Sequence, residues 1–141
     1  MGATKLSVKS ETGKVTRPGR ISITKLCTTE KGDWTAPALV SHALAHLGRY
    51  DKMLMLRAVW GDGTFLYQLL DIPLALLARM KNAEFRVVGT RSGRRSLGAD
   101  VMDRGARVFR VHLDGADGKC QIHDLLVERC RLLRQWRQPI E

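Results

Sequence analysis

The stretch Lys52-Met-Leu-Met-Leu-Arg-Ala-Val-Trp60 decides the fold. This run is almost wholly apolar, and at nine residues it has the length of a strand that is buried in a domain. Gly61-Asp-Gly63 follows it, and this tripeptide is typical of a hairpin turn. The sequence therefore predicts a hairpin in which residues 65–72 return as the partner strand.

A helix is predicted on each side of this hairpin. Thr35 is a candidate N-cap, Pro37 fits the first turn, and Leu39, Ala43, His46 and Leu47 recur at helical spacing until Gly48. Downstream, Pro73 begins a shorter helix that covers residues 74–80.

Further strands are predicted on both sides of the two helices. Residues 20–26 alternate between apolar and polar side chains, and residues 6–9 form a short strand-like run. Residues 85–88, 97–102, 107–113 and 119–122 are predicted to be antiparallel strands joined by turns rich in Asp and Gly. Residues 124–136 fit both a helix and a strand. We expect one domain over residues 1–141, of class α/β or α+β, with a mixed central sheet and two main helices.

The charge points to a polyanionic partner. Lys and Arg number 24 against 14 acidic residues, which gives a net charge of +10. A basic domain attracts polyanions because each neutralised phosphate releases counterions. No apolar run reaches the roughly 20 residues of a membrane span, and no signal peptide is evident. Three cysteines, unpaired by count and without a C-x-x-C motif, favour a reducing, cytoplasmic setting in which they are packed thiols.

The basic residues are concentrated in two segments. Residues 1–32 contain seven Lys or Arg and two acidic residues, and residues 86–110 contain seven Arg and two acidic residues. Hydroxyl side chains are interspersed, as a phosphate backbone requires, and arginine is the commonest reader of guanine edges. The alternative is a solvated basic surface. We expect DNA contacts that converge on one surface next to Lys9, from Lys14, Arg17, Arg20, Arg91, Arg94, Arg95 and Lys119.

Two other motifs do not support a site. His42 and His46 have the spacing of paired zinc ligands, but the intervening Glu of a metalloprotease motif and a third ligand are missing. The segment from Gly115 to Cys120 resembles a phosphate-binding loop, but it is too short and lacks the Ser or Thr after lysine. It is predicted to be a hairpin turn.

Leu6-Ser-Val-Lys-Ser10 resembles the second half of the PD-(D/E)xK nuclease signature, in which a strand carries an acid, a spacer and a lysine. The segments 20–30, 50–57, 67–73 and 114–121 are also similar to type II restriction endonucleases. The resemblance covers most of the chain and corresponds to the carboxyl-terminal part of such an enzyme.

This resemblance implies a restriction-endonuclease-like fold and a Mg²⁺-dependent, site-specific deoxyribonuclease. Lys9 then corresponds to the catalytic lysine, which stabilises developing negative charge, and Ser7 takes the position of the acid. Glu30 is the expected replacement acid and metal ligand, with Glu11 as the second choice. The upstream catalytic Asp of the pattern is missing, so we expect a truncated or remnant enzyme.

The family also implies double-stranded DNA as the partner and a homodimer that matches palindromic sites. Two alternatives stay open. The chain is a non-enzymatic basic module for DNA or RNA, or it is a partner-dependent subunit in which another chain supplies the missing Asp.

Overall fold

The fold contains two β-sheets, of which the first is mixed. The structure, a computed structural model, describes residues 3–12, 17–29, 35–91 and 93–140. Within these ranges, four strands form a sheet in the order β1-β3-β4-β9, and only the β1–β3 pair is parallel. The strands are β1 (Leu6–Glu11), β3 (Lys52–Gly61), β4 (Thr64–Ile72) and β9 (Arg131–Pro139). The predicted hairpin thus forms the centre of this sheet, and Asp62 and Gly63 at its turn have positive φ angles of 47° and 72°.

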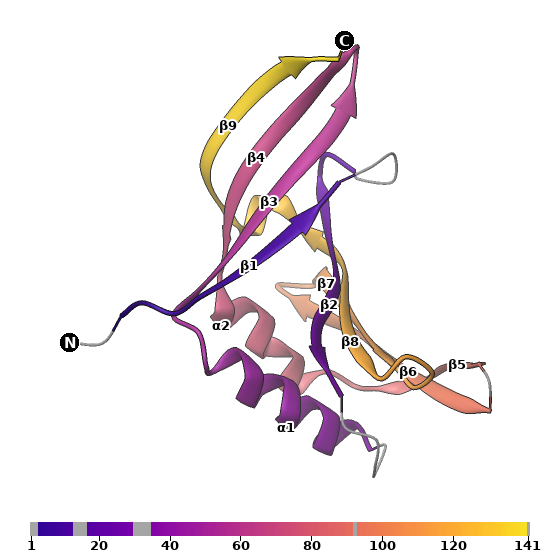
Figure 1. Cartoon of the computed structure of the whole chain (residues 1–141). Helices are drawn as coiled ribbons and strands as arrows, with labels where there is room; N and C mark the ends of the chain where they lie inside the picture. The colour runs from indigo at the N-terminus through magenta and orange to yellow at the C-terminus, as the bar shows by residue number, and fades with distance from the viewer. Residues whose placement is uncertain (1–2, 13–16, 30–34, 92, 141) are drawn as a thin grey trace.

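The second sheet is antiparallel throughout. Its strand order is β2-β8-β7-β6-β5. The strands are β2 (Arg20–Thr28), β5 (Arg86–Arg91), β6 (Arg94–Asp103), β7 (Ala106–Asp114) and β8 (Lys119–Leu126). Along the chain, β2 is the first of these strands and β8 is the last, and yet the two are paired neighbours in the sheet. Figure 1 shows this sheet below the four-stranded sheet.

Two α-helices lie beside β2 (Figure 1). Helix α1 (Ala36–Leu47) begins as expected, because the Thr35 hydroxyl accepts a hydrogen bond from the amide of Ala38 at 3.4 Å. Helix α2 (Leu74–Leu77) is only one turn long and continues as the 3₁₀ helix η1 (Ala78–Asn82), which is tighter than the helix predicted for residues 74–80.

The core lies between the helices and the inner face of the five-stranded sheet. Ile21 and Ile23 of β2 point inward together with Phe109 and Val111 of β7. They pack in one cluster with apolar residues of both helices and with the inner face of β3 and β4, namely Leu39, Val40, Ala43, Leu47, Met53, Met55, Leu70, Ile72, Leu76 and Leu77. The opposite face of the five-stranded sheet is left for polar side chains.

The α+β class, the mixed sheet and the two helices are confirmed. The ambiguous segment 124–136 is mostly extended: β8 ends at Leu126, the single 3₁₀ turn η2 (Val127–Arg129) follows, and β9 begins. Asp124 has a φ of +57°, a conformation that ends a regular strand. Within the described ranges, no helix has the length and apolar character that a membrane crossing needs.

Candidate nucleic-acid interface

The first basic cluster, called here the turn cluster, consists of Arg17 and Arg20 at the start of β2. A hydrogen bond from the amide of Arg20 to the carbonyl of Arg17 closes the turn. Arg57 of β3 holds this turn from within, since its Nη2 donates to the carbonyls of both Arg17 and Arg20. The Arg57 side chain is fully buried, so an internal cation fixes the turn that presents two external ones.

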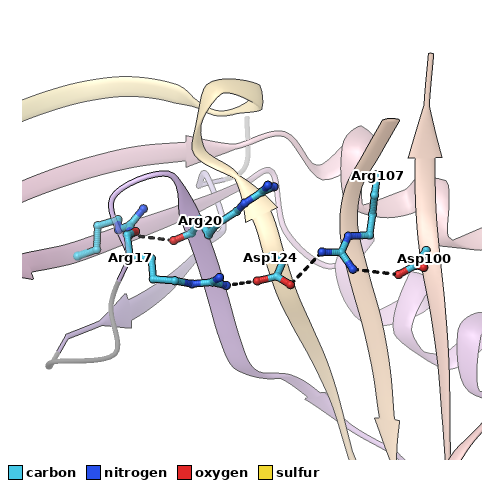
Figure 2. Close-up of polar contacts among 6 residues, drawn as sticks. Arg17, Arg20, Asp100, Arg107 and Asp124 are labelled. Carbon is cyan, nitrogen blue, oxygen red and sulfur yellow. Dashed lines mark hydrogen bonds and ion pairs between the residues drawn. The ribbon is translucent and has the colours of Figure 1, made fainter. Parts of the chain in front are cut away.

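An alternating row of charges continues from Arg17 across the outer face of the five-stranded sheet. Asp124 of β8 accepts from Arg17 and, at 3.1 Å, from Arg107 of β7. Arg107 also lies 3.4 Å from Asp100 of β6, which pairs with Arg110 at 2.9 Å. Figure 2 shows Arg17, Asp124, Arg107 and Asp100 in line across the strands. The row carries more arginines than aspartates and therefore keeps a net positive charge.

The arginines hold both aspartates ionised. The hydrogen bond from Arg110 is the largest cause that lowers the pKa of Asp100. Burial raises the pKa of Asp124, but the hydrogen bond and charge of Arg17 and the charge of Arg107 outweigh it, so its pKa also lies below the usual value. Ionised aspartates fix the direction in which the arginine side chains point.

The second basic cluster, called here the hairpin cluster, consists of Arg91, Arg94 and Arg95 at the β5–β6 hairpin and Lys119 at the start of β8. The loop between β7 and β8, predicted as a turn, packs against this hairpin. Arg91 lies 2.8 Å from Asp117, and Lys119 lies 3.7 Å from the same carboxylate. Arg91 and Lys119 of the hairpin cluster are therefore joined through Asp117 of the β7–β8 loop.

The two clusters lie at opposite ends of the five-stranded sheet. Arg20 opens β2 opposite Leu126, whereas Thr28 closes β2 opposite Lys119. The expectation that these cations converge in one place next to Lys9 is therefore wrong for the described residues, which form two clusters at the two ends of one sheet. The reason is the antiparallel β2–β8 pairing, which puts the start of β2 and the β7–β8 loop at different ends.

Lys9 lies between the two clusters on the neighbouring sheet. Its Nζ is half-buried and donates to the carbonyls of Lys25 at 3.0 Å and Leu26 at 3.4 Å in the middle of β2. Burial lowers the pKa of Lys9, although the nearby Cys27 raises it slightly. Ser7 is buried on the same face of β1. The amine is thus placed by backbone oxygens rather than by an acid.

Glu11, the second-choice acid, faces Arg57 instead of a metal position. Its Oε2 lies 3.6 Å from Nε of Arg57. Burial raises the pKa of Glu11, and the charge of Arg57 counteracts this only in part. Across the described ranges, no group of three or more His, Cys, Asp or Glu side chains could hold a metal ion. Glu30 and Lys14 lie outside the described residues.

Over 136 residues, the chain is 30% identical to a protein named type II restriction enzyme SmaI from Serratia marcescens. The aligned region covers 94% of this chain and 55% of that enzyme. The chain is restriction-endonuclease-like. No family model matches it, and no solved structure matches it.

This restriction-endonuclease-like chain therefore spans about half the length of the relative that it matches. The resemblance to type II restriction endonucleases that was expected from Leu6–Ser10 and the later segments is confirmed as a similarity over most of the chain. Sequence reasoning missed two residues that shape this candidate interface, Arg57 and Asp124. A single arginine inside the apolar run from Lys52 to Trp60 was the available signal for Arg57. No sequence pattern marks Asp124, because its role depends on the non-local neighbours Arg17 and Arg107.

Proposed function

We propose that this chain binds double-stranded DNA. The observation that carries the proposal is the similarity of 94% of the chain to a type II restriction enzyme. The net charge of +10 and the two basic clusters support it, because phosphate contacts dominate the affinity of proteins for DNA. That relative is named as a restriction enzyme, and we extend its DNA substrate to this chain.

The separation of the clusters suits a duplex that crosses the five-stranded sheet diagonally, from the start of β2 to the β5–β6 hairpin. The eight residue steps of β2 are about 26 Å in an extended strand, and the three strand spacings from β2 to β6 are about 14 Å, so the clusters lie about 30 Å apart. Duplex DNA rises about 3.4 Å per base pair, so about nine base pairs span this distance. Between the clusters, Ser22 and Thr24 alternate with the inward-facing Ile21 and Ile23, and they supply hydroxyls on the outer face.

Binding to duplexes of different lengths tests this arrangement. A duplex of six base pairs reaches one cluster, whereas a duplex of 14 base pairs reaches both. Affinity for the longer duplex should therefore rise by more than its larger number of binding registers alone would give. Arg17→Ala with Arg20→Ala should remove most of the gain for the longer duplex. The charge-matched control is the double variant Arg134→Ala with Arg137→Ala on the exposed strand β9 of the other sheet, which should leave the gain intact. An equal loss in the control would contradict the arrangement.

Hydrolysis of phosphodiester bonds with Mg²⁺ is the reaction that the similarity suggests. The described residues do not fit a Mg²⁺ site, because Lys9 has no carboxylate cluster around it there. We propose that Lys9 contacts a phosphate oxygen, since a lysine can stabilise negative charge there without a metal ligand beside it. Ser7 lies behind it, too buried to reach a duplex.

The same observation favours a second function, a non-enzymatic DNA-binding module. A cleavage assay on plasmid with Mg²⁺ or Mn²⁺ separates the two. Metal-dependent cleavage that Lys9→Ala abolishes supports the nuclease. Absence of cleavage, together with unchanged DNA affinity of Lys9→Ala, supports the binding module. Cleavage that appears only after a second polypeptide is added identifies a partner-dependent subunit.

A homodimer is also part of the proposal. Type II restriction enzymes generally act on palindromes, and a two-fold protein symmetry matches such sites. Sedimentation of the protein alone and with a palindromic duplex measures the stoichiometry. A 2:1 complex supports the dimer, and a 1:1 complex on every duplex contradicts it.

A further inference from the structure

The β5–β6 hairpin is the most exposed part of the five-stranded sheet. All six residues of β5 are exposed, and among the described strands β5 pairs only with β6. In Figure 1 the hairpin extends beyond the other strands at the lower right, away from the four-stranded sheet. From Arg86 to Ala99 the sequence contains four arginines and no acidic residue. The end of the hairpin, from Thr90 to Ser96, is therefore a basic two-stranded ribbon that projects past the pairing of β6 with β7, which begins at Leu97.

The base of the hairpin is locked by the β7–β8 loop. Asp114 Oδ1 accepts from the amides of Ala116 at 2.9 Å and Asp117 at 3.1 Å, which fixes the loop. Gly115 packs so closely against β6 that a Cβ on it would lie 2.0 Å from the carbonyl oxygen of Arg95. Its amide lies 3.4 Å from the Ser96 hydroxyl. Only glycine permits this approach, so the loop and the hairpin form one unit.

The three arginines of the hairpin are not equivalent. Arg91 is engaged by two carboxylates, Asp117 at 2.8 Å and Asp114 at 3.4 Å. Arg94 and Arg95 are exposed and have no ion pair or side-chain hydrogen bond with the described part of the chain. They are consecutive in β6, so their side chains leave opposite faces of the strand. Arg91 thus braces the hairpin, while Arg94 and Arg95 are available to a ligand.

We propose that the tip of this braced hairpin enters the major groove of duplex DNA end-on, so that Arg94 and Arg95 on its two faces both contact guanine edges there. The major groove admits a two-stranded β-ribbon, and arginine binds guanine O6 and N7 in a bidentate manner. Arg91, Asp117 and Gly115 act as positioning residues. The inference rests on the proposed DNA binding and adds the element that reads sequence.

Substitutions that keep the charge separate base reading from phosphate contact. The preferred site of the wild-type protein is first selected from a random duplex library. Arg94→Lys and Arg95→Lys retain the positive charge but lose the bidentate pattern. Each should reduce the ratio of affinities for the selected and a scrambled duplex by roughly 5- to 150-fold, while affinity for the scrambled duplex changes about twofold at most. The control Arg137→Lys should change neither value.

Substitutions of the positioning residues Asp117 and Gly115 give a second, independent readout. Asp117→Asn removes the nearer of the two carboxylates that hold Arg91 and adds one net positive charge, so affinity for the scrambled duplex should rise while discrimination falls. Gly115→Ala leaves the charge unchanged and should reduce discrimination alone. Circular dichroism and the unfolding midpoint show whether either variant is folded. If Gly115→Ala does not fold, Arg94→Lys still tests whether the hairpin reads sequence.

The outcomes distinguish this inference from the proposed function. If the wild-type protein binds no duplex, the proposed DNA binding fails. If it binds DNA without any sequence preference, or if Arg94→Lys and Arg95→Lys discriminate as well as the wild-type protein, the hairpin does not read sequence although DNA binding stands.

Discussion

Nη2 of Arg57 lies 2.9 Å from the carbonyl oxygen of Arg20 and donates a hydrogen bond to it. The same nitrogen donates to the carbonyl of Arg17, and the Arg57 side chain is fully buried. The contact joins β3 of the mixed sheet to the turn that begins the antiparallel sheet. A buried arginine thus links the core to the exposed turn cluster.

Removal of Arg57 should destabilise the fold and weaken DNA binding together. Arg57→Ala leaves the Glu11 carboxylate, only 12% exposed, without its cation. Breaking a buried pair in this way costs about 3–5 kcal/mol, which urea denaturation can measure. The double variant Arg57→Met with Glu11→Gln removes both charges and should recover most of the loss in stability, but not the DNA affinity, because the turn stays unsupported.

The control for Arg57 is Arg137→Ala on the exposed strand β9, which should change the free energy of unfolding by less than about 0.5 kcal/mol. If Arg57→Ala and the control have the same free energy of unfolding, the buried pair of Arg57 and Glu11 does not stabilise the turn.

The row of charges through Asp124 should make stability depend on pH in the acidic range. The lowered pKa of Asp124 means that its ionised form is favoured in the folded state. Its contribution is therefore fully present above the unfolded pKa of about 3.9 and is lost as the pH falls through the folded value. Asn tolerates the positive φ of residue 124, so Asp124→Asn removes the charge without straining the backbone.

Thermal unfolding of Asp124→Asn and the wild-type protein from pH 7 to pH 2 measures this effect. The difference should be about 1 kcal/mol between pH 7 and pH 5, and should close as the pH falls well below about 4. A difference that does not change with pH would contradict an ionic role for Asp124.

Cys130 should react slowly with thiol reagents in the native protein. Burial raises the pKa of the Cys130 thiol to about 11. At pH 8 its thiolate fraction is then roughly 250-fold lower than that of an ordinary cysteine with a pKa of about 8.5. Modification by a chromogenic disulfide should be slow until urea is added. Fast modification of the native protein at Cys130, identified by mass spectrometry, would contradict this.

The local features of the fold could be predicted from the sequence, and the long-range ones could not. Thr35 and Gly48 mark the ends of α1, and Gly61-Asp-Gly63 marks the hairpin, because caps and turns depend on neighbouring residues. The division into two sheets depends on the pairing of Ile21 with Leu125, which no local pattern reveals.

The same distinction applies to the interface. The two basic segments were visible as composition, but their separation depends on which strands pair. Residues 124–136 were ambiguous because a single 3₁₀ turn interrupts two strands there, and because β9 finds its partner in β4. The apolar side chains of β9 are spaced for neither a clean helix nor a clean strand.

The salt dependence of duplex binding tests the central claim most directly. Affinity for a 14-base-pair duplex is measured between 50 and 200 mM salt. If the two basic clusters together neutralise six phosphates, affinity should fall by about a thousandfold over this range. The loss should be smaller for the variant that carries Arg17→Ala and Arg20→Ala, since fewer counterions are released. An affinity that does not change with salt would contradict binding of the phosphate backbone by these clusters.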